Sequence, residues 1–568
     1  MKVRNLLLIG LTSVMAWSCS DDELQGGNNN KPASSKNYIE VSIKMPTTTR
    51  TATPGQGEEV GLDFENEVNS VLILAVEAEG NVGENFTKEN VLQLARVVSS
   101  SDGGLYVDYQ KATAILKNIT LDIHKLYTIY AFVNPTEEMI SNYQSMVGSI
   151  WNKDGVISPT SYNDAYTFIE SMTFKGYTKR DFSRDGTESI KGNFLMTDTK
   201  ATGVNSRGIK AVYKFDDLGD NMYKLTAATN VERAVARFDY KNNGLYKLPN
   251  GPTGDQLMDG KGSKEELKIE LIGYKIMNIG KSFYHLKRVS DTFQGVNYDY
   301  GGIELPNNYV VDADWEKKKE WLKSLEEAEQ EETTFDIKSL FFVPLNGNDS
   351  DDYISLDGLF EDNDENWSGN EGEILDRNNY KVLAYCTENT IPSDNEQLNG
   401  LSTAIVFKAE ITGDFIEEET IALYRYNNTI YNNWDRVWEQ YKGENSEASI
   451  STENEYYEQC QTAGKTPEIT RWKVDNRKAY CYYAYWNRHN DNGISTVMGP
   501  MEFAVVRNNI YKLDVQAIYK LGSPTDPTNP DKEDPWEPAE PDEKNEIEMT
   551  VEVKVLNWAV RLNHIEFD

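Results

Sequence analysis

Residues 547–568 read IEMTVEVKVLNWAVRLNHIEFD, and this stretch, the tail, sets the expectations for the fold. Apolar residues alternate with polar ones from Ile547 to Val555, which is the two-residue period of a half-buried β-strand. The alternation changes parity at Val555-Leu556, so we expect a bulge or bend there if both halves of the tail face one core. The side chains expected to fill a core are Ile547, Met549, Val551, Val553, Val555, Trp558, Val560, Leu562, Ile565 and Phe567.

The segment before the tail has the composition of a linker. Residues 522–545 contain six prolines and eight Asp or Glu residues. Such a segment buries little apolar surface and is expected to be extended, spanning up to about 70 Å at about 3.1 Å per residue. The sequence therefore leaves open whether the tail fills a core of its own chain or of a neighbour.

The composition predicts a mostly β protein with two or more domains. The chain has 568 residues, including 33 Tyr and 11 Trp, which is too long for one ordinary core and rich in strand-forming residues. Its formal net charge of -35 argues against nucleic acid as a partner, because a polyanion would be repelled. We expect a protein exposed at a surface.

The first residues have the pattern of an export signal. Lys2 and Arg4 precede a short apolar run at 6–16, which predicts a signal peptide over residues 1–18. Cys19 follows directly and resembles the lipidated cysteine of a bacterial lipobox, and the stretch SDDE at 20–23, with three acidic residues, resembles the signal for surface export of lipoproteins in Bacteroidota. An acyl chain on Cys19 would attach the precursor to the outer membrane. The alternative is an ordinary secretory signal that leaves Cys19 unmodified.

A second alternating stretch lies near the N-terminus. Residues 38–45 (YIEVSIKM) alternate and end at Pro46, which predicts a strand. The loop that follows, TTTRTATPG at 47–55, holds Arg50 in an unpacked setting that a trypsin-like protease can cut. Cleavage between Arg50 and Thr51 would separate the lipid and the first strand from the rest of the chain. The alternative is that Arg50 is only a solvated side chain.

The remaining chain predicts two tandem β-sandwiches with short peripheral helices. We expect strands at 68–78, 105–108, 112–116, 127–133, 194–196 and 222–227 in the first unit, and at 231–240, 269–279, 339–344, 380–386, 404–411, 480–485 and 509–517 in the second. We expect helices at 136–151, 162–172 and 314–331. The expected divisions are a signal peptide at 1–18, a lipidated spacer and removable strand at 19–50, sandwiches at 51–229 and 230–521, a linker at 522–545 and the terminal strand at 546–568.

Motifs of catalysis and of metal binding do not stand out in the sequence. The four histidines are scattered, and the cysteines Cys386, Cys460 and Cys481 have neither zinc-ligand spacing nor the even number of a disulfide framework. We therefore expect no enzyme activity, no metal and no cofactor. There are two alternatives. One is calcium binding at the acidic runs 349–352 and 362–365, and the other is sugar stacking on the aromatic residues of 424–438 and 481–486.

Taken in order, these features resemble the fimbrillins of Bacteroidales, the type V pilins, and in particular the Mfa-type minor fimbrial subunits. The local stretches that carry the resemblance are YTIYAFVN at 127–134, YYAYWN at 482–487, RNNIY at 507–511, the PTDP linker and VLNW at 555–558 leading to Phe567. The resemblance implies two transthyretin-like Greek-key sandwiches and a lipoprotein precursor carrying palmitate or a similar acyl chain on Cys19.

The resemblance also implies how such a subunit would assemble. A trypsin-like surface protease would cut at Arg50-Thr51, the first strand would leave, and the C-terminal donor strand of another subunit would fill the groove. The partners implied are other copies of the chain, related anchor and tip pilins, the protease and, for the precursor, the outer membrane. We expect a structural subunit, with a role in the stalk favoured, that supports adhesion or biofilm. The alternative is a monomeric surface lipoprotein that binds glycan or host protein through exposed aromatics.

Overall fold

The fold is taken from a computed structural model of the chain. The residues that the structure describes are 37–44, 58–60, 63–84, 86–108, 111–149, 166–168, 194–198, 211–241, 243–248, 254–258, 266–287, 298–300, 303–305, 310, 312–327, 336–341, 344–345, 353–356, 380–391, 396–445, 452–494, 497–526, 528–529, 537–542 and 549–559.

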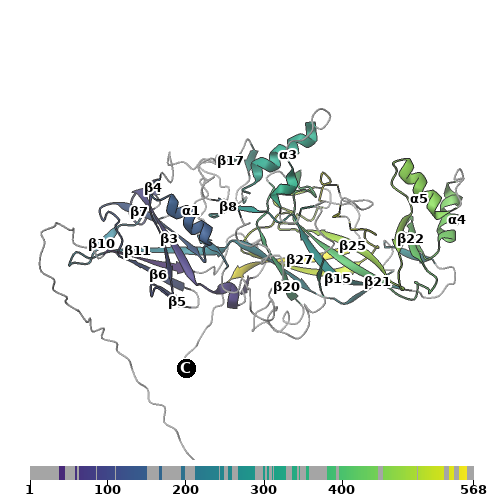
Figure 1. Cartoon of the computed structure of the whole chain (residues 1–568), viewed down its shortest axis with the longest axis horizontal. Helices are drawn as coiled ribbons and strands as arrows, with labels where there is room; N and C mark the ends of the chain where they lie inside the picture. Colours follow the sequence, from purple (N-terminus) through teal and green to yellow (C-terminus); the bar gives the residue numbers. More distant parts are fainter. Residues whose placement is uncertain are drawn as a thin grey trace, which may run out of the picture.

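The described parts form three units in a row (Figure 1). An N-terminal sandwich lies at one end, a C-terminal sandwich in the middle, and a small sheet carrying two helices, the distal sheet, at the other end. The mostly β class is therefore confirmed, and helices lie at the periphery, where α3 (Trp315–Glu327) covers one side of the C-terminal sandwich.

The N-terminal sandwich contains strands in the spatial order β4-β3-β7-β9-β11-β1-β6-β5, with β10 beside β11. Its two layers are joined by β11, whose residues 224–230 pair with β1 while residues 231–233 pair with β9. The bounds are β1 Tyr38–Lys44, β3 Ser70–Gly80, β4 Phe86–Ser99, β5 Leu105–Asp108, β6 Lys111–Lys117, β7 Leu126–Val133, β9 Met196–Asp198, β10 Phe215–Asp217 and β11 Tyr223–Arg233.

The strands β3 and β7 are buried on both faces, which explains their nearly continuous apolar sequences. One face packs against β1 and β6 inside the N-terminal sandwich, through residues such as Ile73 and Ile129. The other face packs against α1 (Glu137–Ser145) and joins the core of the C-terminal sandwich, through residues such as Leu72 and Phe132. The side chain of Thr136 caps α1 by accepting a hydrogen bond from the Met139 amide.

The C-terminal sandwich packs two sheets face to face. One sheet has the order β2-β27-β26-β12-β20 and the other has β13-β15-β21-β25, with the short β19 beside β15. Their shared core includes Phe238 and Leu513 from the first sheet and Phe407 and Tyr483 from the second. The bounds are β2 Glu58–Val60, β12 Val235–Lys241, β13 Leu245–Leu248, β15 Leu267–Met277, β19 Ile354–Ser355, β20 Tyr380–Thr387, β21 Ala404–Thr412, β25 Ala479–Trp486, β26 Asn509–Ile518 and β27 Met549–Ala559.

Three strands of the distal sheet and its two helices are inserted between β21 and β25, two strands that are themselves neighbours in the C-terminal sandwich, and the fourth strand, β14, comes from the connection between β13 and β15. It has the order β14-β23-β22-β24 and is covered by α4 and α5. The bounds are β14 Gln256–Met258, β22 Ala422–Tyr426, β23 Thr429–Tyr431, β24 Thr470–Lys473, α4 Trp434–Glu444 and α5 Glu453–Thr462. The other short elements are η1 Asp63–Asn66, β8 Tyr166–Phe168, β16 Ser282–Tyr284, β17 Tyr298–Tyr300, β18 Ile303–Leu305 and η4 Ile337–Leu340.

Three expectations about local structure are wrong. Tyr166–Phe168, expected in a helix, forms β8 and pairs with β16. Ile337–Leu340 forms the 3₁₀ helix η4 where a strand was expected from Ser339, and its first turn is capped by Asp336. The parity change at Val555-Leu556 produces no bulge, because both residues pair with β26 in continuous register. The irregularity lies instead between Val515 and Ala517 of β26, opposite Val551 and Thr550.

The described part of the linker is docked rather than extended into solvent. Gly522 passes so close to β25 that a Cβ atom would lie 2.2 Å from the carbonyl oxygen of Tyr482. The amides of Asn399 and Gly400 donate to the carbonyl oxygens of Glu540 and Pro538, at 2.9 and 2.8 Å. Asp526 and Thr528, which lie between Gly522 and Pro538 in the sequence, are also buried. Polar composition therefore does not prevent burial here, since backbone hydrogen bonds satisfy the docked segment.

Candidate functional site

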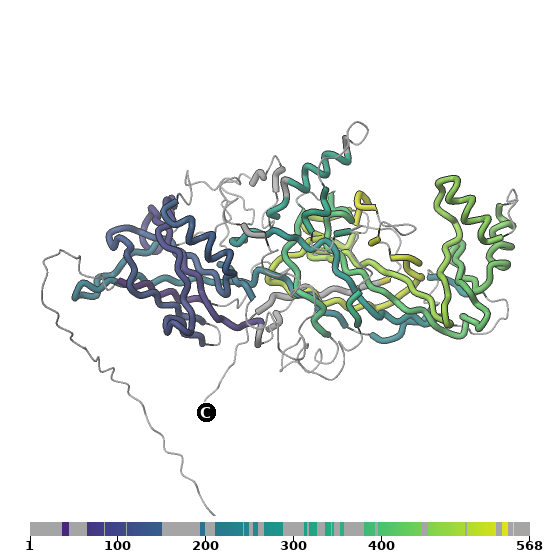
Figure 2. Tube along the Cα trace, viewed as in Figure 1, coloured from purple at the N-terminus to yellow at the C-terminus, as the bar shows by residue number. Residues whose placement is uncertain are grey.

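The first strand lies in the interior of its sheet, between two strands that are far from it in sequence. All seven residues of β1 pair with β11 in parallel and with β6 in antiparallel register. Figure 2 shows this purple strand beside the teal segment that contains β11. We call the space that β1 fills the slot, and its lining residues on the core side are Leu225 and Ala227 of β11 and Ala112, Ala114 and Leu116 of β6.

The core side of β1 is completely buried. Ile39, Val41 and Ile43 have no solvent-exposed surface and belong to the core of the N-terminal sandwich. Burying three such side chains contributes on the order of 5–9 kcal/mol before entropy is counted. Removal of β1 would therefore expose an apolar groove and two unpaired strand edges at once.

The outer side of β1 is polar and carries one ion pair. Glu40 lies 2.9 Å from Nζ of Lys224 on β11, and both side chains are partly exposed. The same ammonium group lies 5.8 Å from the ring centre of Tyr38. The hydrogen bond with Glu40 raises the pKa of Lys224. The slot thus offers a positive charge on its outer rim.

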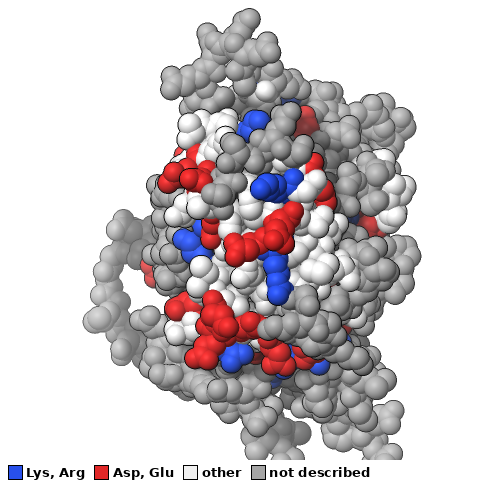
Figure 3. Space-filling model, turned by 90° about the vertical axis from the view of Figure 1, so that its right-hand side faces the viewer, with Lys and Arg blue, Asp and Glu red and all other residues white. Residues whose placement is uncertain are grey.

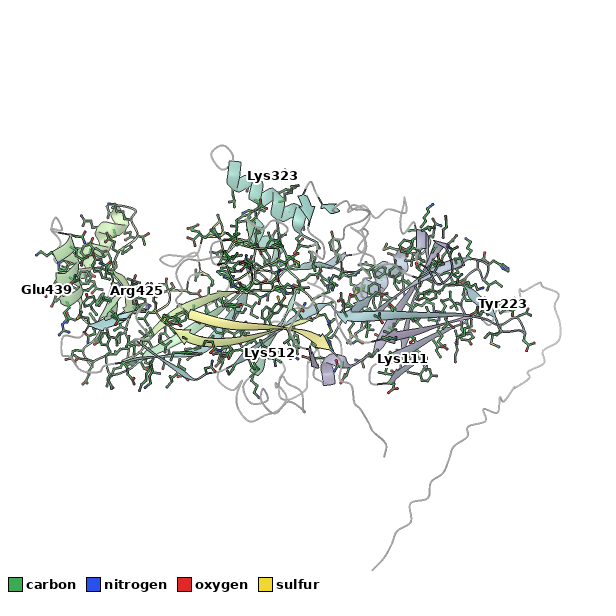
Figure 4. All side chains as sticks on the ribbon, turned by 180° about the vertical axis from the view of Figure 1, so that it is seen from behind. Lys111, Tyr223, Lys323, Arg425, Glu439 and Lys512 are labelled. Atoms are coloured by element: carbon green, nitrogen blue, oxygen red, sulfur yellow. The ribbon has the colours of Figure 1, made fainter. Side chains whose placement is uncertain are left out.

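The slot has a direction along the molecule. Figure 4 labels Tyr223, the neighbour of Lys224, at the outer tip of the N-terminal sandwich, and Lys111, the partner of Lys44, toward the C-terminal sandwich. Since Tyr38 pairs with Lys224, β1 begins at the outer tip and runs toward the boundary between the sandwiches.

The predicted processing residues fall between and before the described segments. Cys19, Arg50 and Thr51 lie outside the described residues. β1 ends at Lys44 and the next described segment begins at Glu58, so Arg50 belongs to the connection between β1 and β2. A cut there would leave β1 held to the rest of the protein by noncovalent contacts alone.

The tail divides into a docked part and a part outside the described residues. Met549, Val551, Val553, Val555 and Trp558 belong to β27, which pairs with β26 from Met549 to Asn557. The half-buried Met549 packs on the core that joins the two sandwiches. Ile547, Val560, Leu562, Ile565 and Phe567 lie outside the described residues. The structure therefore brings the first half of the tail to its own chain and does not bring it to the slot.

The outer edge of β27 is covered by β2, a contact that the sequence did not reveal. Glu58, Glu59 and Val60 pair in parallel with Asn557, Trp558 and Ala559. Immediately after β2, the buried carboxylate of Glu65 accepts hydrogen bonds from Arg237 at 2.9 and 3.1 Å and from the Tyr385 hydroxyl at 2.5 Å. These contacts fix the segment that follows the predicted cleavage position against the C-terminal sandwich.

A second buried arginine joins the two sandwiches. Arg507 forms an ion pair with Glu388 and donates to the carbonyl oxygen of His285 at 3.3 Å and to Thr197 of β9 at 3.4 Å. Burial, followed by the positive charge of Arg507, lowers the pKa of His285 to about 3, so this imidazole is neutral at physiological pH. Its Nδ1 lies 2.9 Å from the hydroxyl of Tyr143 on α1.

The aromatic residues once considered for sugar stacking form a core instead. Tyr424, Tyr426, Tyr431 and Trp438 are buried between the distal sheet and its two helices, together with Tyr456 of α5, and Tyr483, Tyr485 and Trp486 of the second stretch are buried in β25. Figure 3 shows this end of the molecule face on, with Asp and Glu side chains gathered on it and Lys and Arg between them. The cluster therefore stabilises the distal sheet and gives the glycan-binding alternative no exposed aromatic platform at these residues.

The described residues form neither a metal cluster nor a disulfide. Within these ranges no three His, Cys, Asp or Glu side chains gather as a metal site would require. Cys386, Cys460 and Cys481 form no disulfide. Of the helices in the described part of the chain, none has the length and apolar character needed to cross a membrane. Both acidic runs considered for calcium, 349–352 and 362–365, lie outside the described residues.

Comparison with known proteins identifies the C-terminal part of the chain. Residues 476–564 match the family described as major fimbrial subunit protein type IV, fimbrillin, C-terminal. The matched range contains β25, β26 and β27, so it includes the docked half of the tail. The match confirms the resemblance to the fimbrillins over this range. No curated protein matches the chain.

Two solved structures align over nearly the whole chain at low similarity. A protein of Bacteroides eggerthii described as a candidate cell adhesion protein is 10% identical with a TM-score of 0.32, covering 94% of this chain and 98% of the other. The C-terminally truncated tip fimbrial protein Mfa3 of Porphyromonas gingivalis is also 10% identical with a TM-score of 0.30, covering 92% and 99%.

Proposed function

We propose that this chain, with its fimbrillin C-terminal region at 476–564, is a structural subunit of a cell-surface fimbria that assembles by strand exchange. In this proposal the precursor is exported as a lipoprotein anchored through Cys19 and cut after Arg50. The slot then receives the donor strand of another subunit. A stalk position is favoured because the chain has both a cleavable loop and a terminal apolar segment.

One observation carries the proposal. β1 is an interior strand of its sheet, yet it is N-terminal to the predicted cut and so loses its only covalent link to the sheet when the chain is cut. An interior strand that can be detached leaves a site whose complement is another β-strand, because only a strand satisfies both backbone edges and the apolar floor.

The energetics favour an order of events. Before cleavage β1 is part of the same molecule, so its effective concentration in the slot exceeds that of any competing strand. After cleavage a lost β1 is diluted, whereas each neighbouring subunit still carries its tail. Assembly therefore needs no nucleotide and no catalytic side chain in the subunit itself.

The Arg50→Ala variant tests the processing step. We expect surface fimbriae of the native protein to begin at Thr51 by N-terminal sequencing. The variant should remain a lipid-anchored monomer with an unchanged unfolding temperature, because residue 50 lies between two segments that stay in place. Replacement of Arg233, a buried arginine that donates to the carbonyl oxygen of Glu65, would instead lower stability and is the contrasting case. Fimbriae built from the Arg50→Ala protein with residues 38–44 retained would contradict the proposal.

A further inference from the structure

We propose that the slot takes residues 563–567 of a second copy in the register that residues 37–41 hold in this structure, with Lys224 recognising Glu566. This inference rests on the strand-exchange function proposed above and adds to it the segment, the direction and the register. Residues 563–567 are the partner segment, and the slot itself consists of described residues.

The two ends of the chain resemble each other in sequence. Residues 37–41 read NYIEV and residues 563–567 read NHIEF. Asparagine, isoleucine and glutamate occupy the same places, a ring side chain stands before each isoleucine, and an apolar residue follows each glutamate. A strand with this pattern presents two apolar side chains to one face and a carboxylate to the other.

The slot matches this pattern of two buried apolar side chains with a carboxylate between them. Ile39 and Val41 are fully buried, and Glu40 between them points outward to Lys224 at 2.9 Å. In the same register Ile565 and Phe567 enter the core, and Glu566 takes the place of Glu40. The partners of Val41 on the two flanking strands are Ala114 and Ala227, whose small side chains leave lateral room for a larger ring.

Charge favours this register over one in which Val560 and Leu562 enter the core. Placing Val560 and Leu562 in the sites of Ile39 and Val41 would set Arg561 in the position of Glu40. Arg561 would then face Lys224, and like charges on neighbouring strands are destabilising. The positive rim of the slot therefore favours Glu566.

A second stretch of the chain also resembles β1. Residues 545–552 read NEIEMTVE, against NYIEVSIK at 37–44. Four residues of that stretch, Met549 to Glu552, are already in β27 and pair with Ile518, Ala517, Val515 and Asp514. Their donation would require β27 to leave its place between β26 and β2, whereas residues 563–567 follow the end of β27 and can be donated with β27 in place.

Geometry assigns the donated segment to a neighbour rather than to its own chain. β27 ends at Ala559, which pairs with Val60, and Figure 1 shows the end of β27 near the boundary between the sandwiches. The slot begins beside Lys224, which precedes Arg233 by nine residues on β11. Nine residues of β-strand span roughly 30 Å, so the start of the slot lies about that far from Arg233. The connection 560–562 spans only about 13 Å to residue 563. In the parallel register, a subunit therefore cannot fill its own slot without releasing β27.

A charge exchange tests the role of Lys224. Polymer of the cleaved full-length protein is diluted into urea at low salt, and the rate at which subunits leave is measured. We expect Lys224→Glu and Glu566→Lys each to speed dissociation about fivefold, and the double variant to return within about twofold of the native rate. Lys88→Glu, on the exposed face of β4, should leave the rate unchanged. Rescue of Lys224→Glu by Glu548→Lys instead of Glu566→Lys would overturn the proposal in favour of residues 545–552.

A disulfide tests the register directly. Glu40 pairs with Ile115, whose amide donates away from β1 to Gly104 at 2.7 Å, so the two residues form a non-hydrogen-bonded pair with closely spaced Cα atoms. In a Cys460→Ser background, Ile115→Cys with Glu566→Cys should give a disulfide between subunits of the oxidised polymer. Ile115→Cys with Glu548→Cys, the matched control, should not.

The outcomes separate this inference from the function on which it rests. A polymer that forms normally but is linked through position 548, or through neither position, overturns the assignment of residues 563–567 while strand exchange stands. Native protein that is cleanly cut at Arg50, has lost β1 and remains monomeric overturns the proposed function itself.

Discussion

At the scale of single residues, buried charges hold the segment that follows the predicted cleavage position. Glu65 is fully buried and lies between Arg237, Tyr385 and the backbone contact with Arg233. Carboxylates are rarely buried without such partners, because the desolvation of a charge must be offset by paired hydrogen bonds. The arrangement keeps β2 beside β27 and so defines where the tail leaves its own domain.

Glu65→Gln is expected to destabilise the protein by about 3–5 kcal/mol, because it removes one of the two carboxylates that form ion pairs with the buried Arg237 in the described part of the chain. Urea unfolding of the uncleaved protein measures the change. Glu79→Gln is the matched control, since Glu79 forms a 4.0 Å surface ion pair with Lys88 and its replacement should cost less than about 1 kcal/mol. Equal losses of unfolding free energy for the two substitutions would show that the buried network stabilises the protein no more than the surface ion pair does.

At the scale of elements, two strands at opposite ends of the chain have different roles. β1 fills an interior position of the N-terminal sandwich through two ladders, whereas β27 is an interior strand of the C-terminal sandwich between β26 and β2. Only β1 precedes the predicted cut. The docked part of the tail is therefore a structural strand in this arrangement, and the segment after Ala559 is the candidate for donation.

Two truncations separate these roles. Ending the chain after Ala559 should preserve the native unfolding temperature and cleavage at Arg50 but abolish polymer formation. Ending it after Asp542 removes β27 and exposes the edge of β26, where Tyr511, Leu513 and Val515 are fully buried, so the unfolding temperature should fall and aggregation should rise. Calorimetry and size-exclusion chromatography provide the readouts. Normal polymer from the chain ending at Ala559 would contradict the role assigned to the end of the tail.

The local sequence pattern predicted several strands and helices correctly and failed to predict others. The strand at 105–108 is found at those residues, and the helix expected from residue 136 begins after its cap Thr136. The 14-residue β4 was missed because FTKENVLQLARVVS mixes apolar and polar residues with no clean alternation, and its ladder with β3 is irregular at three points. Residues 166–168 were assigned to a helix, although pairing with the distant β16 makes them a strand.

The site was predicted in part. The sequence indicated β1, the loop with Arg50 and the apolar tail, because each is a local pattern. It did not indicate that β6 and β11 would flank β1, since these strands lie more than sixty residues away and are joined to β1 only by tertiary pairing. Lys224 and β2 were missed for the same reason, because nothing in their local sequence distinguishes them from other exposed residues.

At the scale of the whole molecule, the slot and the end of β27 lie at different places along an elongated row of units. The slot begins at the outer tip of the N-terminal sandwich, while β27 ends near the boundary between the two sandwiches. Repeated donation from one copy to the next is a heterologous contact that does not close on itself, and such contacts build open filaments. Cleavage would act as the trigger because it converts a tethered strand into one that can be displaced.

The size of the full-length precursor after cleavage tests this account most directly. The Cys19→Ser precursor, which cannot be lipidated, is treated with an Arg-specific protease until residues 1–50 are cut from the rest, and the products are followed by light scattering and mass spectrometry. The account predicts that β1 is lost and that filaments grow as it is lost, while the Arg50→Ala precursor stays monomeric under the same treatment. Cleaved protein that has released β1 and still remains monomeric at high concentration would contradict it.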